Sequence, residues 1–301
     1  MELSGLLEDL QDRLRPLKAQ MFPQQVLLEL QDTALCGQVL KDDAPLPVSL
    51  EAPLPALTCR EGMPLEREPL GDLIGDLLVN ENQQDAYVHA VLPFEAAHWR
   101  VIVWSDGEMP ADPEAELRRI DPELNLPFTL EEAYLDVQAL PGSPPQMLPQ
   151  MLMVASPRKL VDGWIEVFSL AGAKLDRLAP AQSCLLAALA EELEAAPPDR
   201  LLVLLVPEDF ECKLLFFHRG LPVFERSLPV GGEDLIDQLK RCLVFYHRQA
   251  PELRSLRLLI TAEISGQEQL EEALGVPARL LDFQPYGSLL LQGLAAQRGL
   301  G

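Results

Sequence analysis

The sequence predicts an α/β protein built from two similar lobes, with a small α+β subdomain inserted into the first lobe. A length of 301 residues suggests about two domains, and a hydrophobic content of 48% is enough for a large buried core. In the second half, apolar and alternating segments follow the order three strands, helix, strand, helix, strand, helix. The first half repeats this order around an insertion, and a repeated unit predicts duplicated lobes.

The second lobe is expected at residues 199–301, after the proline pair at 197–198. Three strands open it, and the tight turn His218-Arg219-Gly220 joins the second strand to the third. Its cap subdomain is expected to be reduced, because Gly231-Gly232 leads almost directly into the next helix. The predicted elements are strands at 201–206, 210–217, 223–228, 256–261 and 278–283, and helices at 233–249, 267–274 and 287–298.

The first lobe is expected at residues 21–93 plus 149–196, with the inserted subdomain at 94–148. An amphipathic helix at 1–20 precedes it. The polar face of that helix mixes acidic with basic residues, which favours packing on protein over lying on a membrane. In this lobe we predict strands at 26–30, 35–40, 85–92, 151–155 and 175–178, helices at 69–78, 159–170 and 181–195, and an irregular or edge-strand region at 44–69.

Two such units facing each other across a cleft form the duplicated ribonuclease-H-like plan of actin, hexokinase and the Hsp70 ATPase domain. The charge balance then excludes several functions. With 47 acidic and 24 basic residues, the net charge of −23 argues against nucleic acid and against direct contact with anionic lipid. No signal peptide or apolar span is apparent, so we expect a cytoplasmic protein without membrane insertion.

No metal site is predicted from the sequence. The five cysteines lie far apart without a C-x-x-C pair, and the four histidines show no i, i+4 spacing. The acidic loop at 106–114 lacks the ligand spacing of a calcium loop, which favours a solvated acidic loop.

Three stretches resemble the PilM family of type IV pilus assembly proteins: Leu124–Leu140, Leu152–Gly172 and Gly220–Gly232. The resemblance covers about residues 85–300. It implies an actin-like fold with an extra subdomain at 94–148 and a scaffolding role at the cytoplasmic face of the inner membrane. The implied partner is the cytoplasmic N-terminal tail of a PilN-like inner-membrane protein, with other pilus platform proteins and the assembly ATPase as further contacts. Many members of the family also bind ATP.

The sequence departs from the pattern with which actin-like proteins hold a nucleotide. Their phosphate turns carry Asp-x-Gly, because glycine lets backbone N–H groups approach the phosphates and the aspartate lies near the metal. Six positions differ here: Glu29 and Gln31 in the first lobe, Val206 and Glu208 in the second, and Ala262 and Glu263 in the nucleoside loop. The sequence therefore predicts no bound ATP or magnesium, no catalytic residues and no enzymatic activity.

Aromatic and proline residues around the inserted subdomain form the candidate partner site. Such a cluster is either the core of the subdomain or an apolar groove for an extended peptide. The resemblance places the family's peptide site in this neighbourhood, and an acidic protein suits a tail that contains Arg or Lys. The candidate residues are Pro93, Phe94, Trp99, Pro127, Phe128 and Tyr134.

These observations predict a non-catalytic scaffold of pilus assembly that binds a PilN-like tail. Two alternatives remain. One is an active, ATP-binding member of the same family whose cleft tolerates Glu29 and Glu208. The other is a small-molecule kinase of the hexokinase type, which needs a catalytic aspartate at the cleft.

Overall fold

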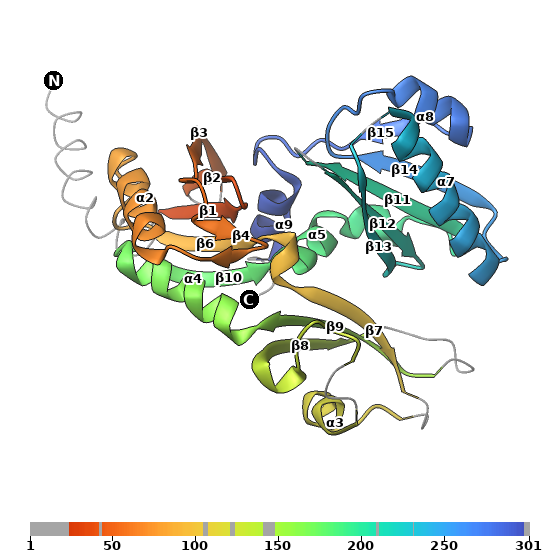
Figure 1. Ribbon diagram of the computed structural model, residues 1–301, viewed down its shortest axis with the longest axis horizontal. Coiled ribbons are helices and arrows are strands. Elements are labelled where there is room, and N and C mark those ends of the chain that lie inside the picture. The colour runs from red at the N-terminus through yellow and green to blue at the C-terminus, as the bar shows by residue number, and fades with distance from the viewer. Residues whose placement is uncertain are drawn as a thin grey trace, which may run out of the picture.

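The structure is a computed structural model, and it describes residues 24–41, 44–104, 108–120, 124–140, 148–208, 211–230 and 232–297 (Figure 1). The helix expected at 1–20 lies outside the described residues. Within the described part, no helix combines the length and apolar character needed to cross a membrane.

Each lobe contains a five-stranded mixed sheet, and the two sheets share one strand order. In each, the first three strands form an antiparallel meander, and the two later strands add in parallel beside the first. The lobe I strands are β1 (Gln25–Leu30), β2 (Ala34–Lys41), β3 (Ala44–Pro53), β6 (Tyr87–Leu92) and β10 (Lys174–Pro180). The lobe II strands are β11 (Arg200–Pro207), β12 (Glu211–His218), β13 (Leu221–Pro229), β14 (Ser255–Ile260) and β15 (Ala278–Leu280).

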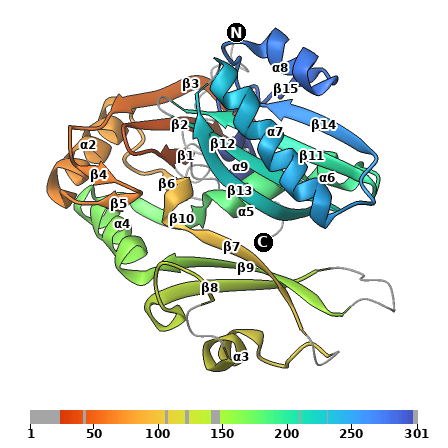
Figure 2. The ribbon, with the colours of Figure 1, turned by 45° about the vertical axis from the view of Figure 1, so that its right-hand side comes forward.

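Helices cover both faces of each sheet, because the central strands are apolar on both sides. On the outer face of sheet I lie α2 (Arg67–Asn80) and α4 (Arg158–Leu170). On the outer face of sheet II lie α7 (Gly232–Gln249) and α8 (Gln267–Leu274). Between the sheets lie α5 (Ala181–Ala188), followed by the short α6 (Ala190–Glu194), and α9 (Leu289–Gln297) (Figures 1 and 2).

The inserted subdomain is a three-stranded antiparallel sheet in the order β7-β9-β8, with α3 (Pro113–Ile120) against one face. Its strands are β7 (His98–Val103), β8 (Ala133–Ala139) and β9 (Gln150–Pro157). The prediction that the strand at 151–155 belongs to lobe I is therefore wrong, because β9 pairs with β7 and β8 along its length. Moving β9 into the insertion leaves lobe I with the same five-strand unit as lobe II.

The C-terminal helix α9 also lies in a different part of the molecule from the one expected. Residues 199–301 were expected to form lobe II, but α9 packs against α5 and the lobe I strands β1 and β6. The two helices fill the space between the sheets and make one core with both of them. The two lobes are thus joined by a continuous apolar layer.

Short connections place the remaining segments around the cleft. The small strands β4 (Cys59–Arg60) and β5 (Met63–Pro64) form a hairpin, and η1 (Phe94–Ala96) joins β6 to β7. At the β12–β13 turn both Arg219 and Gly220 have positive φ, as a two-residue hairpin requires. In lobe II, β13 leads to α7 and α7 to β14, with no further helix between them among the described residues.

A candidate cleft between the lobes

A cavity of about 1150 Å³ opens where the two lobes and the inserted subdomain meet. Its walls come from the β1–β2 turn, the β4–β5 hairpin, η1, the end of β11 and the start of α9. Four of the six positions at which the sequence departs from the nucleotide pattern line this cavity: Glu29, Gln31, Val206 and Glu208. The topology thus brings together turns that are far apart in the sequence.

Glu29 lies in β1 beside this cavity, and both oxygens of its buried carboxylate accept hydrogen bonds. Gln31 Nε2 donates to Oε1 over 2.9 Å, and Ser288 Oγ donates to Oε2. The Ser288 oxygen also accepts the backbone N–H of Leu291 at 3.1 Å, which caps the first turn of α9. The Glu29 carboxylate therefore fastens the start of α9 to lobe I. The backbone N–H of Gln31 donates to the Ala34 carbonyl at 3.0 Å, so it is engaged within the turn.

Asp32 follows in the same turn and also lines the cavity. Its Oδ2 accepts the backbone N–H of Glu61 at 2.6 Å, and its Oδ1 accepts that of Gly62 at 2.9 Å. Cys59 Sγ adds a longer contact of 3.3 Å to Oδ1. The Asp32 carboxylate is thus held against the β4–β5 hairpin, which it orders.

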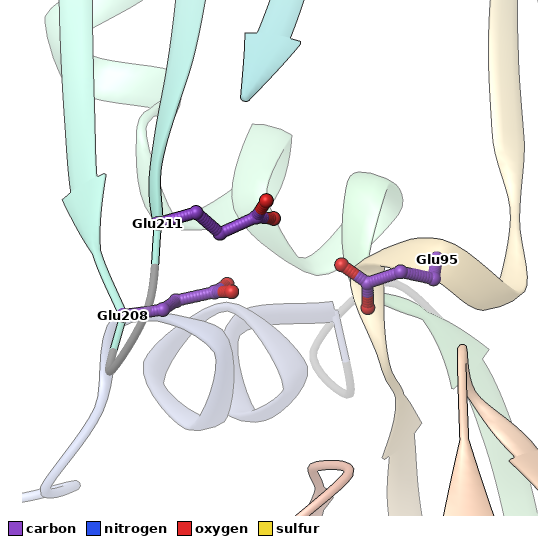
Figure 3. Close-up of side chains that lie close together, drawn as sticks. All are labelled: Glu95, Glu208 and Glu211. Atoms are coloured by element: carbon purple, nitrogen blue, oxygen red, sulfur yellow. The ribbon is translucent and has the colours of Figure 1, made fainter. Parts of the chain in front are cut away.

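On the lobe II side, Lys213 places its ammonium group among three carboxylates. Its Nζ donates hydrogen bonds to Glu95 and to Glu211, the latter at 3.2 Å, and lies 3.6 Å from a Glu208 oxygen. The Lys213 side chain is 6% exposed, whereas its three partners are 35–41% exposed. Figure 3 shows the carboxylates of Glu208 and Glu211 directed toward Glu95, which lies in η1. The cluster therefore joins lobe II to the segment between lobe I and the subdomain.

The three carboxylates around Lys213 are spaced like the ligands of a cation, and the lysine ammonium takes that place. Burial acts to lower the pKa of Lys213, but its hydrogen bond to Glu95 and the neighbouring carboxylates outweigh burial and raise that pKa, so the ammonium stays charged. Oxygens of the three carboxylates lie within 4.8 Å of one another, as in a divalent cation site. Lys213 supplies the positive charge in this position, and like charge disfavours a second cation.

Glu208 gives this cluster a pH dependence. Burial raises the pKa of Glu208 to about 7. The charge of Lys213 opposes this rise, and Glu95 and Glu211 add to it. Because the folded-state pKa lies above the ordinary value of 4.5, the folded protein holds this proton more tightly than the unfolded chain does. The resulting stabilisation is complete below the ordinary pKa and is lost as pH rises through about 7.

Glu208→Gln is therefore expected to match the parent protein in free energy of unfolding near pH 4 and to exceed it near pH 8. The substituted amide resembles the protonated carboxyl and does not ionise. Urea denaturation of both proteins at the two pH values measures the difference. An equal difference at both pH values would contradict the assignment of the titration to Glu208.

The nucleoside-loop positions lie apart from the cavity. Thr261 lines it, whereas among the described residues Ala262 and Glu263 are exposed outside it. The loop turns back into lobe II, where Ile264 is buried in the core. The backbone N–H of Gly232, at the start of α7, donates a hydrogen bond to the Ser265 carbonyl of this loop over 3.1 Å. One of the N–H groups that a helix leaves unpaired at its start is therefore engaged by the protein itself.

The predicted partner-site residues divide into three groups. Pro93, Phe94, Pro127 and Phe128 all line the cavity, and the exposed Pro127 and half-buried Phe128 form its rim on the subdomain. Trp99 is 5% exposed and packs edge-on against Phe217, with ring centroids 6.0 Å apart, so it belongs to the core between subdomain and lobe II.

Tyr134, the remaining predicted residue, does not line the cavity. It is exposed on β8, its hydroxyl donates to Asp162 over 3.0 Å, and the Arg158 guanidinium lies 4.8 Å from its ring centroid. Tyr134 therefore contacts α4. Trp99 and Tyr134 thus lie away from the cavity that the other four candidate residues line.

Sequence reasoning did not single out Lys213, Glu95 or Ser288. Lys213 carried a signal, since it is a lone cation within the apolar strand 212–217, and a buried lysine requires a charged partner. Glu95 and Ser288 carried none. Their partners lie 118 and 259 residues away in the chain.

No protein-family model matches this chain, and no curated protein matches it. Among solved structures it is similar to a chain of a PilM–PilN type IV pilus biogenesis complex, with a TM-score of 0.69 and 22% identity over 92% of this chain and 98% of that one. A Bacteroides thetaiotaomicron protein of unknown function with an actin-like ATPase fold gives a TM-score of 0.54 and 10% identity, over 93% and 97%. The cytoplasmic domain of EpsL, an inner membrane component of the type II secretion system of Vibrio cholerae, gives a TM-score of 0.50 and 11% identity, over 92% of this chain and 94% of that one. The actin-like fold expected from the sequence is confirmed, and at the level of the fold so is the likeness to PilM.

Proposed function

We propose that this chain is a cytoplasmic scaffold of a pilus assembly system, which binds the cytoplasmic tail of a PilN-like inner-membrane protein and does not hydrolyse ATP. The observation that carries the proposal is the structural similarity to a chain of the PilM–PilN complex, which extends over nearly the whole length of both chains. Through this partner the protein would lie at the inner membrane without entering it, and it would contact other platform proteins there.

The contents of the cleft support a role in binding without catalysis. The turns that would cradle phosphates hold Glu29 and Glu208, and Glu29 is engaged with α9. Asp32, the aspartate in the β1–β2 turn, has both oxygens engaged by backbone N–H groups, which disfavours a kinase that needs a free catalytic carboxylate. Lys213 fills the space among the carboxylates with a side chain of the protein itself.

The rim of the cavity suits an extended peptide. Pro127 and Phe128 offer an apolar wall on the subdomain, and the buried Phe94 lines the same cavity. The exposed carboxylate of Glu61 lines the same cavity and adds an acidic group to it. A tail with an apolar residue beside a lysine or arginine would match both features.

The first test is calorimetric titration with a synthetic peptide of the N-terminal tail of the PilN-like protein from the same organism. Phe128→Ser and Pro127→Asp are each expected to weaken binding about tenfold or more, since loss of a central apolar anchor typically costs over 1 kcal/mol. Tyr134→Ser is the matched control, because Tyr134 lies outside the cavity, and it is expected to leave the affinity unchanged. Equal loss in all three variants, or no binding by the parent protein, would refute the proposed site.

The second test addresses the alternative of an active ATP-binding protein. Titration of the parent protein with ATP and magnesium is expected to give no heat of binding at nucleotide concentrations up to the millimolar range. Micromolar affinity would contradict the non-catalytic part of the proposal and favour the alternative. Tail binding is measured separately, so the two parts of the proposal can fail independently.

A further inference from the structure

The outer face of α7 combines cations with exposed apolar side chains. Val244 and Phe245 are 55% and 54% exposed, and the helical period places Lys240, Arg241 and Arg248 around them in the C-terminal half of the helix. The exposed Asp234 and Asp237 lie on the same side in its N-terminal half. Among the described residues none of these three cations forms an ion pair. Other arginines of this acidic protein, such as Arg219 and those at 67, 118, 119, 257 and 279, are paired with glutamates.

The outer face of α2 carries a stripe of acidic side chains. Glu68, Asp72 and Asp76 follow one another at intervals of four residues and form a single exposed stripe, which Val79 extends with a side chain that is 51% exposed. None of the three carboxylates forms an ion pair with a described residue. The stripe on α2 is about 12 Å long, and the distance along α7 from Arg241 to Arg248 is about 10 Å, at a rise of 1.5 Å per residue.

These two faces cannot meet within one molecule. α2 lies on the outer side of lobe I and α7 on the outer side of lobe II, near opposite ends of the long axis (Figure 1), and α7 lies across the outer surface of the second sheet (Figure 2). A second copy displaced along this axis would bring its α2 to the α7 of the first. Such a contact is heterologous and continues head to tail.

Two general effects bear on this arrangement. Helix dipoles favour acidic residues early in a helix and basic residues late, which accounts for part of the charge pattern but not for Val79, Val244 and Phe245 in the exposed faces. A net charge of −23 on each copy is repulsive at long range. At physiological ionic strength that repulsion is screened beyond about 8 Å, so the charges of the two facing helices decide the contact.

We propose that α7 of one copy docks on α2 of a second copy of this chain, with the cations of α7 against the acidic stripe of α2 and the exposed apolar side chains between them. This inference is independent of the proposed pilus function. A contact between two helices is small, so the association is weak and reversible, and depends on salt.

The test uses charge reversal on the full chain, followed by sedimentation velocity up to about 300 µM protein, a range that covers weak contacts. The parent protein is expected to self-associate with rising concentration. Arg241→Glu with Arg248→Glu, or Asp72→Lys with Asp76→Lys, is expected to weaken association at least about tenfold. An equimolar mixture of the two variants restores complementary faces and is expected to associate again, as is one chain that carries all four changes.

Two controls keep this test decisive. Phe245→Ser is expected to weaken association, whereas Ile120→Ser, at a residue on α3 that is 55% exposed, is not. Circular dichroism and thermal unfolding establish that each variant is folded. A parent protein that stays monomeric throughout, an association unaffected by either reversal, or a mixture that stays monomeric would each overturn the proposal.

Discussion

Lys213→Met is expected to lower the free energy of unfolding by about 2–4 kcal/mol at neutral pH, one of the two largest effects predicted for a single substitution. Methionine fills the buried stem of the side chain but leaves three neighbouring carboxylates without their shared cation. Removing one partner of a buried ion pair typically costs 3–5 kcal/mol, and about 2–4 is expected here because the three glutamates are partly exposed and can turn toward water. Urea denaturation measures the change.

Two comparisons separate this explanation from simple loss of packing. Lys213→Arg keeps the positive charge and is expected to retain most of the stability. The effect of Lys213→Met should also shrink as pH falls toward 5, because Glu208, whose pKa is raised to about 7, then takes up a proton and leaves less negative charge without a partner. A loss that is equal for both substitutions, or constant from pH 5 to pH 8, would show that side-chain shape and not charge is what the site requires.

Local sequence patterns predicted the fold well where such a pattern determines which strands pair with one another. The two-residue turn at Arg219 and Gly220 fixes an antiparallel hairpin, and the repeated order of elements fixes the duplication. The strand at 151–155 was placed in the wrong sheet for a physical reason. Both its faces are buried, so its apolar run is the same whichever sheet it joins, and only its hydrogen bonds to β7 and β8 decide.

The sequence could predict which turns form the candidate site, but it could not predict the contacts that these turns make with distant parts of the chain. Glu29 and Glu208 could be placed at the cleft because each lies at the end of the first strand of a repeated unit, Glu29 within β1 and Glu208 just after β11. Their partners could not, since a sequence position does not say that Ser288 at the start of α9 reaches back to β1. Trp99 and Phe128 likewise belong to the same aromatic cluster in the sequence, yet one is in the core and the other at the rim of the cavity.

Gly293→Ala is expected to destabilise the protein by about 3 kcal/mol, although alanine normally favours a helix by about 1 kcal/mol over glycine. Gly293 lies in α9 where that helix crosses α5. A Cβ atom there would lie 1.8 Å from the backbone oxygen of Cys184 and 2.6 Å from its carbonyl carbon. Backbone atoms cannot rotate away as a side chain can, so the two helices must separate by more than 1 Å in the layer that joins both sheets.

The matched control is Gly75→Ala in α2, where a Cβ atom would lie 3.2 Å from the Ala171 carbonyl oxygen, a distance that a small shift accommodates. It is expected to change stability by less than about 1 kcal/mol, because the gain in helix propensity offsets the tighter contact. Urea denaturation compares the two variants, and hydrogen exchange is expected to show faster opening of α5 and α9 in Gly293→Ala only. If both alanine variants were equally stable, the close crossing of α5 and α9 would not be the contact that holds the lobes together. The ion cluster at Lys213 would then be the contact between lobe II and the rest of the molecule to examine.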